Sequence, residues 1–211
     1  MKIISLTFNP FAENTLLMVG QKGSCIIIDP GMMDAQEMDH LEHTIQNEGA
    51  TPLRLLLTHC HIDHVLGIKA VYDRYGLEPE CHAEGLPLLE ACPQIAKMYA
   101  IPYTEGPMPT NYLADSGTLE LDGEEVEWRY VPGHAPGHVV FIHHPSKQVI
   151  GGDTLFQSSI GRTDLPGGDH ELLLRKIREE LFSLDDEYVV WPGHGPRTTI
   201  GVEKRSNPFL R

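Results

Sequence analysis

The segment at residues 58–64, Thr-His-Cys-His-Ile-Asp-His, places four side chains that can bind a metal ion within six positions. Imidazole and carboxylate ligands of this kind suit zinc, iron or manganese. The segment directly follows the apolar run at residues 53–57, which is typical of a strand buried on both faces. A polar cluster at the end of a buried strand contributes little to packing. We therefore expect a site that binds metal and performs chemistry on it.

The spacing within the cluster indicates room for two metal ions. In an extended chain, side chains two residues apart point the same way, so His59 and His61 can reach one ion together. Asp63 and His64 are adjacent where the chain turns into a predicted helix, so we expect them to point in different directions and to suit a second ion. The alternative for Asp63 is a helix N-cap. Cys60 is expected to point away from the histidines, with a soft metal ligand as the alternative.

Three further candidates lie downstream, at His134, Asp153 and His194. Each follows an apolar, strand-like run and stands beside glycines, which let the backbone approach a ligand closely. One histidine after Pro-Gly would ordinarily indicate a surface turn. Three such positions together with the first cluster favour a shared site.

The surrounding sequence predicts the elements that must position these residues. Alternating or continuous apolar runs bounded by turn residues indicate strands, and apolar residues three and four apart indicate helices. A proline-rich stretch at residues 101–111 is predicted to be a loop long enough to form an active-site flap. The predicted strands are residues 3–8, 14–19, 25–28, 53–57, 118–121, 126–131, 138–143, 148–151 and 188–191. The predicted helices are residues 34–46, 63–75, 84–99 and 169–182. This order predicts a mixed α/β sandwich in one domain.

Composition narrows the class of protein. The 211 residues are 41% hydrophobic and carry a formal net charge of −14, which disfavours nucleic-acid partners and anionic membrane surfaces. No signal peptide and no apolar stretch of membrane-spanning length is visible. The four cysteines show no C-x-x-C spacing and are expected to be free thiols. A cytoplasmic protein is the expectation, and nothing in the sequence indicates an oligomeric state.

The pattern His59-x-His61-x-Asp63-His64 with His134, Asp153 and His194 resembles the ligand set of the metallo-β-lactamase superfamily. Asp29, in Ile-Asp-Pro-Gly, resembles the upstream acidic motif of that family. The resemblance implies an α/β fold, a four-layer αββα sandwich, in one domain over residues 1–211, with the metals at one edge of the two sheets. It implies two divalent ions, with zinc favoured and iron or manganese as alternatives.

The resemblance also implies roles for these residues. His59, His61 and His134 would hold one ion, Asp63, His64 and His194 the other, and Asp153 would bridge the two. A metal-bound hydroxide would attack the substrate carbonyl. Asp63 would orient that hydroxide or accept its proton. Asp29 would steady a ligand or nearby backbone, with a turn aspartate at a strand end as the alternative.

Within the superfamily, residues 152–156 and the sequence Gly-Arg-Thr-Asp at 161–164 resemble short single-domain relatives of glyoxalase II, the hydroxyacylglutathione hydrolases. The implied reaction is hydrolysis of a small thioester, S-2-hydroxyacylglutathione or a related acyl-thiol. The chain ends 17 residues after His194, without that family's C-terminal helical domain for glutathione. Arg162 is expected to bind a substrate carboxylate, with a salt bridge to Asp164 as the alternative. The alternative reaction is an iron-dependent persulfide dioxygenase, in which His59, His134 and Asp153 would bind one iron.

Overall fold

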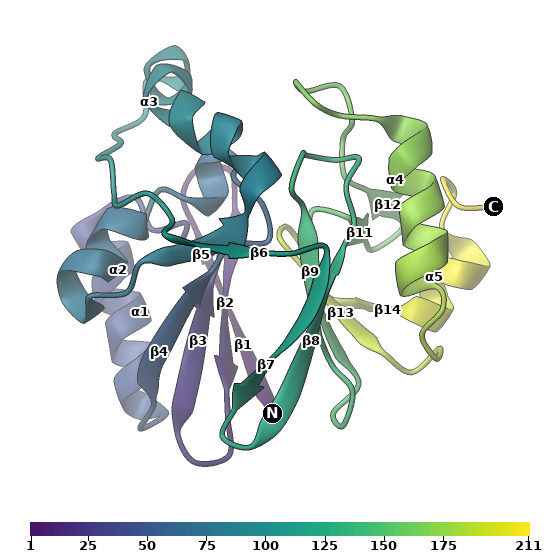
Figure 1. Cartoon of the computed structure of the whole chain (residues 1–211), viewed down its shortest axis with the longest axis horizontal. Coiled ribbons are helices and arrows are strands. Elements are labelled where there is room, and N and C mark those ends of the chain that lie inside the picture. Colours follow the sequence, from purple (N-terminus) through teal and green to yellow (C-terminus); the bar gives the residue numbers. More distant parts are fainter.

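Two six-stranded sheets lie against each other in the computed structural model, which describes residues 1–211 (Figure 1). The first sheet has the order β1-β2-β3-β4-β5-β6 and the second has the order β14-β13-β10-β9-β8-β7. The strands of the first sheet are β1 (Lys2–Phe8), β2 (Glu13–Val19), β3 (Ser24–Ile28), β4 (Thr51–Leu56), β5 (Pro79–His82) and β6 (Asn111–Leu113). Those of the second are β7 (Ser116–Leu121), β8 (Glu124–Tyr130), β9 (Val139–His143), β10 (Gln148–Gly152), β13 (Val189–Pro192) and β14 (Thr198–Thr199).

Helices cover the outer face of each sheet (Figure 1). On the first sheet they are α1 (Ala35–Asn47), α2 (Ile68–Tyr75) and α3 (Leu86–Tyr99). On the second they are α4 (His170–Lys176), which continues into a π-helical turn at Ile177–Leu181, and α5 (Ile200–Ser206). Buried apolar side chains form three clusters, one between the sheets and one under each helical layer. The predicted αββα sandwich is confirmed.

The central strands are buried on both faces, which explains why they read as near-continuous apolar runs. In β2, Leu17 belongs to the cluster under the helices, whereas Leu16 and Met18 belong to the cluster between the sheets. In β3, Ile27 and Ile26 divide in the same way. This alternation follows from the two-residue period of a strand.

The topology brings the ends of four strands to one edge. β3 runs parallel to β4, and β10 runs parallel to β13, so the carboxyl ends of each pair meet. Asp29 follows β3, the residues 58–64 follow β4, Asp153 follows β10 and His194 follows β13. Carboxyl ends of parallel strands are a usual place for a ligand site in α/β sheets.

The predicted helix over residues 63–75 is wrong at its start. Ile62–His64 form one 3₁₀ turn and α2 begins only at Ile68. The backbone N–H of Gly67 donates to the Pro30 carbonyl at 2.7 Å, and a Cβ on Gly67 would lie 3.0 Å from that oxygen. Because this contact fixes the chain before α2, Asp63 and His64 lie on a tight turn rather than on a helix.

The stretch at residues 101–111, predicted to form an active-site flap, does not border the ligand residues. Its residues Tyr103 and 105–108 line a second cavity of about 230 Å³, together with Leu89 and other residues of α3. Gly106 packs so closely there that a Cβ would lie 2.5 Å from Ile68 Cγ2. The loop therefore supports α3 from behind, and α3 itself borders the ligand residues.

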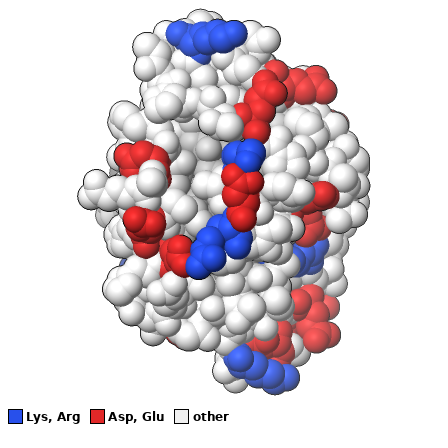
Figure 2. Space-filling model, turned by 90° about the vertical axis from the view of Figure 1, so that its left-hand side faces the viewer, with Lys and Arg blue, Asp and Glu red and all other residues white.

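The helical face of the first sheet carries interleaved charges (Figure 2). Lys and Arg side chains lie beside Asp and Glu there, and the pairs include Lys69 with Asp73 and Arg74 with Glu42. No basic patch forms on this face. None of the helices is both long and apolar enough to span a membrane.

Candidate metal centre

The seven residues expected to bind metal converge at the edge where the four strands end. One ligand atom from each of His59, His61 and His134 lies within 4.8 Å of the others, and the same holds for two further sets, one of which joins Asp29 to His59 and His64. The first ligand group is His59, His61 and His134, and the second ligand group is Asp63, His64 and His194. These are the two groups that the family resemblance implied.

Asp153 lies between the two ligand groups. Its Oδ2 atom is 3.6 Å from His134 Nε2 in the first group and 3.5 Å from His194 Nε2 in the second. Its Oδ1 atom is 3.6 Å from His64 Nε2. One carboxylate thus faces both groups, as a bridging ligand must. The chain at residue 193 can pass close to Asp153 only because it carries a glycine there. A Cβ on Gly193 would lie only 2.2 Å from Asp153 Oδ1.

Several buried polar atoms at the centre have no hydrogen-bond partner. They are the Nε2 atoms of His59, His61 and His64 and Oδ1 of Asp153. His61 Nδ1 also lies 2.9 Å from His134 Nε2. A buried polar atom without a partner costs about 1–3 kcal/mol, so this concentration requires an explanation. Bound divalent cations would provide that explanation. Imidazole and carboxylate groups are suitable ligands, and an ion would give each of these atoms a partner.

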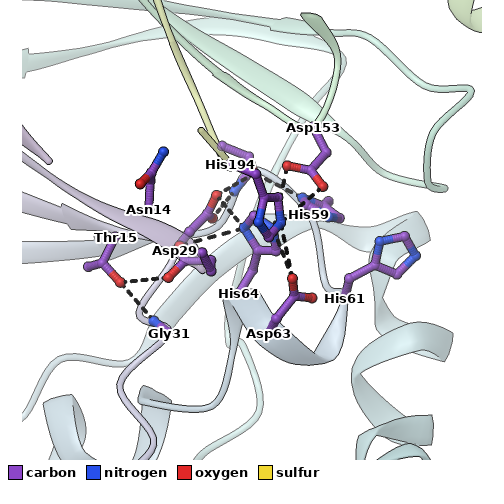
Figure 3. A network of polar contacts seen from close by, with 12 residues as sticks. Asn14, Thr15, Asp29, Gly31, His59, His61, Asp63, His64, Asp153 and His194 are labelled. Carbon is purple, nitrogen blue, oxygen red and sulfur yellow. Dashed lines mark hydrogen bonds and ion pairs between the residues drawn. The ribbon is translucent and has the colours of Figure 1, made fainter. Parts of the chain in front are cut away.

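Asp29 and Thr58 hold two ligand rings in place, and Figure 3 shows Asp29 beside His64. Asp29 accepts hydrogen bonds from Thr58 N at 2.7 Å and Thr58 Oγ1 at 2.6 Å, and it lies 3.1 Å from His64 Nδ1. Thr58 Oγ1 in turn lies 3.0 Å from His59 Nδ1. With Nδ1 donating, each ring presents the lone pair of Nε2 to the centre, as in many metal sites. Asp29 reaches this position in the left-handed region, at φ 53°, where aspartate is one of the better-tolerated residues.

Main-chain carbonyls hold two other ligand rings. His134 Nδ1 donates to the Arg162 carbonyl at 2.7 Å. His194 Nδ1 lies 3.1 Å from the Phe11 carbonyl and 3.3 Å from that of Ala12. The loop at Phe11 and Ala12 precedes β2, so the N-terminal sheet orients a ligand that comes from the C-terminal sheet.

Asn14 is a positioning residue that the sequence did not reveal. Its backbone N–H donates to the Gly193 carbonyl at 2.7 Å, and its side-chain amide donates to the carbonyls of Pro192 and Gly195 at 3.1 and 2.9 Å. These contacts fasten the loop that carries His194. The signal in the sequence was the polar run at residues 13–15 opening an apolar strand, which we interpreted only as the edge of that strand.

Glu13 is a second residue missed from the sequence. It is fully buried, accepts a hydrogen bond from Thr15 Oγ1 at 2.9 Å, and approaches His64 Nδ1 at 3.8 Å. Burial raises the pKa of Glu13 well above its ordinary value, more than the nearby His64 lowers it. Thr15 also accepts from the Gly31 N–H at 2.9 Å, so the polar run at the start of β2 ties together the loops around the centre (Figure 3).

Cys60 points away from the ligand histidines, as expected, and His138 supports the centre. His138 accepts a hydrogen bond from the Asp153 backbone N–H at 3.0 Å and stacks on the His59 ring at 4.8 Å. Cys60 is buried in the apolar cluster under the helices together with Cys81 and Cys92. All four cysteines are free thiols. Asp63 and His64 differ from expectation, because they converge, with Asp63 Oδ2 only 3.7 Å from His64 Nε2.

Burial and neighbouring charges set the protonation of the ligands. Burial, helped by surrounding histidines, lowers the pKa of His59 well below its ordinary value and that of His61 to about 4. These rings are therefore neutral near pH 7, the form that binds metal. Burial opposes ionisation of Asp153, but His64 and other histidines hold its pKa below the ordinary value. Burial also opposes the charged form of His64, but Asp63 and Asp153 raise its pKa well above the ordinary value.

A cavity of about 1180 Å³ opens onto the centre. The ligands His61, Asp63, His134, Asp153 and His194 line one of its sides. Arg162 also lines the cavity, and its guanidinium makes two hydrogen bonds of 2.7 Å to the Asp164 carboxylate. The arrangement can therefore present two metal ions to a small molecule held in the cavity.

Comparison with known proteins places this architecture. Residues 8–194 match the metallo-beta-lactamase superfamily. The hydroxyacylglutathione hydrolase GloC of Haemophilus influenzae is 38% identical over 212 residues, covering 100% of this chain and 98% of that protein. The crystal structure of the B3 metallo-beta-lactamase BLEG-1 is similar with a TM-score of 0.90, 33% identity and 99% of each chain covered. The di-iron-bound form of TTHA1623 is similar with a TM-score of 0.86 and 39% identity, covering 98% of this chain and 100% of that one.

Proposed function

The chain belongs to the metallo-beta-lactamase superfamily, and on that premise we propose that it is a hydrolase that cleaves thioesters. The proposed substrate is S-2-hydroxyacylglutathione or a related acyl-thiol. One observation carries the proposal: two ligand groups share Asp153, and buried Nε2 atoms without partners face the space between them. The similarity to a hydroxyacylglutathione hydrolase along the whole chain supports the choice of a thioester.

Two divalent ions bound here would supply hydroxide near neutral pH and polarise a carbonyl oxygen. His59, His61 and His134 would hold one ion. Asp63 lies at the cavity surface, with Oδ2 3.1 Å from His194 Nε2. Burial opposes its ionisation, but His64 and His194 lower its pKa overall. Asp63 is thus ionised near neutral pH, and in this proposal its carboxylate orients the attacking water.

Arg162 is the proposed contact for a substrate carboxylate. Its side chain lines the cavity and is 59% exposed, paired with Asp164, which is 68% exposed. Such an exposed ion pair contributes little, so a substrate carboxylate can replace Asp164 at the guanidinium fork. The Arg162 carbonyl meanwhile keeps its hydrogen bond with His134.

The metal remains to be chosen by experiment. Zinc, iron and manganese all suit histidine and carboxylate ligands. TTHA1623, 39% identical to this chain, has been crystallised with two iron ions. We retain zinc as the proposed metal for hydrolysis because it supplies hydroxide without redox chemistry.

A second candidate, hydrolysis of β-lactams, rests on the similarity to BLEG-1 along the whole chain. Thioester and β-lactam hydrolysis both direct hydroxide at a carbonyl carbon, so the same residues would serve either. The similarity to the hydroxyacylglutathione hydrolase GloC along 98% of that protein favours the thioester.

The test is to determine the metal content of the purified protein and to assay three reactions side by side. They are hydrolysis of S-lactoylglutathione, hydrolysis of a penicillin, and oxygen uptake with glutathione persulfide. We expect two ions per chain and fastest turnover with the thioester. Persulfide-dependent oxygen uptake with one iron per chain would instead establish the dioxygenase. Penicillin hydrolysis without thioester hydrolysis would establish the lactamase.

A further inference from the structure

Helix α3 carries apolar residues beyond those that the core buries fully, although two of them, Leu88 and Ile95, also pack in part against the core cluster. Leu89, Cys92 and Ala96 are buried in the cluster beneath the helix. A surface helix of a globular protein usually has a single apolar stripe facing the core. A second set of apolar residues on α3, again three and four apart, therefore needs its own explanation. This α3 stripe consists of Leu88, Ala91, Ile95 and Met98.

The α3 stripe lines the cavity that opens onto the metal centre. Tyr99 extends it by one residue and packs edge-on against Phe11, with ring centroids 5.5 Å apart. At 1.5 Å per residue, the stretch from Leu88 to Tyr99 runs for about 16 Å along the cavity. The stripe remains open to solvent at its end, where Met98 is 82% exposed. In Figure 1, α3 lies at the upper end of the half of the molecule that contains the first sheet, across from the segment before α4.

Residues outside α3 add further apolar lining to the cavity. They are Phe11, Phe156, Ile160, Leu165 and Pro166. Apart from the ligand residues, the only charged side chains in the lining are Glu84 and Arg162. Glu84 accepts a hydrogen bond from the Tyr130 hydroxyl, and Arg162 is paired with Asp164.

This charge distribution bears on the substrate. Glutathione carries two carboxylates and one ammonium group, and burying a charge requires a partner. Apart from the ligand histidines, Arg162 is the only cationic side chain in the lining, and it can meet one carboxylate. The long apolar walls have no role toward such a charged peptide, whereas they suit an aliphatic or aromatic group.

We propose that the α3 stripe is a subsite for an apolar group of the substrate, a chain of about four or more carbons attached to the thioester. The inference rests on the proposed thioester hydrolysis and names its substrate class. The apolar group lies either in the acyl part or in the thiol part, and both place it along α3 while the carbonyl faces the ligand residues. The stripe acts through van der Waals contact and desolvation, so it selects the substrate without taking part in bond cleavage.

A binding series tests the subsite without any turnover. Metal-free protein is titrated by calorimetry with S-methyl-, S-butyl- and S-hexylglutathione, thioethers that cannot be hydrolysed. Each added methylene that becomes buried should tighten binding by up to about fourfold. Ile95→Gln should remove most of this gain, whereas Lys97→Gln on the polar face of α3 should retain it. Affinity that does not change with chain length, or a gain that survives Ile95→Gln, overturns the subsite.

A turnover series distinguishes the two parts of the substrate. In one set glutathione is fixed and the acyl group grows from acetyl to hexanoyl; in the other acetyl is fixed and the thiol changes from glutathione to hexanethiol. We expect kcat/KM to rise with chain length in one set, and Met98→Gln to flatten that rise. Flat values in both sets overturn the substrate class. Absence of turnover with every thioester overturns the proposed function, and the binding series then still decides on the subsite.

Discussion

The ligand side of the cavity and its α3 side differ in how their side chains are held. Four of the five ligand histidines have Nδ1 at a hydrogen-bond partner, and for three of them that partner comes from another part of the chain, such as Asp29 or the Arg162 carbonyl. On α3, Ile95 and Met98 make apolar contacts only, and Met98 is mostly exposed. The first side is fixed in one geometry, as catalysis requires, whereas the second can adapt to different apolar groups. Substitutions on the ligand side should therefore affect every substrate, and those on the other side only some.

The largest effect is expected from His59→Ala, which removes a ligand from the first group. Hydrolysis should fall by more than about 10³-fold for every thioester, because removal of even one oxyanion donor costs about 10²–10³. Metal analysis should show loss of at least one ion per chain. His170→Ala, at the exposed first residue of α4, is the control. Retained activity in metal-free His59→Ala would contradict a metal-dependent reaction.

The ligand side should also respond to pH when metal is removed. Burial lowers the pKa of His61 to about 4 in the folded protein, whereas histidine in an unfolded chain titrates near 6.5. Between these pH values the unfolded chain binds more protons, so the free energy of unfolding falls as the pH falls. His61 contributes up to about 3 kcal/mol to this loss, and His59 and His134 act in the same direction.

Urea unfolding of the metal-free protein at pH 7 and pH 5 measures this effect. We expect lower stability at pH 5. The raised pKa values of His64 and His194 act in the opposite direction. Their effect is confined to the upper part of this range, because unfolded histidine is itself mostly protonated below about pH 6.5, so they offset only part of the loss. Equal or greater stability at pH 5 would show that the ligand rings are not held neutral by burial.

Asp29→Asn tests whether the ligand side depends on its supporting hydrogen bonds. Asparagine keeps the shape and tolerates the positive φ, but its amide nitrogen cannot accept. It therefore loses either the bond from the Thr58 backbone N–H or the contacts of the other oxygen with Thr58 Oγ1 and His64 Nδ1. Loss of such a support typically weakens metal affinity by about 10–100-fold, measurable by competition with a chromophoric chelator.

The matched control is Asp122→Asn. Asp122 also has a positive φ, at 58°, and its Oδ2 accepts from the backbone N–H groups of Lys22 and Ser24 far from the ligand residues in sequence. Its substitution should leave metal affinity unchanged. Unchanged affinity in Asp29→Asn as well would assign Asp29 to the turn alone.

The smallest effect is expected from Arg162→Ala, which changes a proposed substrate contact and leaves the ligand residues in place. KM should rise about tenfold for thioesters that carry a carboxylate near the carbonyl, with little change in kcat, since a hydrogen bond to a charged group contributes about 1.5–3 kcal/mol. Steady-state kinetics measures this, with Arg175→Ala on α4 as the control for loss of an exposed guanidinium. Unchanged KM for every acyl-thiol that is turned over would remove Arg162 from substrate binding.

The residues of the ligand side could be predicted from the sequence because metal binding requires particular residue types. Few patterns place His59, His61, Asp63 and His64 together, and glycines mark the ends of the strands that bring in the others. The strands β3 and β4 were also predictable, since apolar runs bounded by turns indicate them.

The supports of that side could not be predicted in the same way. Asn14 acts on carbonyls almost 180 residues away, and nothing in its neighbourhood indicates such a contact. The delayed start of α2 likewise depends on Gly67 meeting the Pro30 carbonyl. The helix at residues 84–99 was predicted. That its α3 stripe and the ligand residues line the same cavity depends on the folded structure and could not be predicted.

The central claim is that the two ligand groups hold two ions that together support thioester hydrolysis. The most direct measurement is to titrate metal-free protein with zinc while following hydrolysis of S-lactoylglutathione or of the best thioester from the substrate series. Activity should rise with added zinc and reach its plateau at two ions per chain. A plateau at one ion per chain, or activity that appears only with iron and consumes oxygen, would contradict the claim.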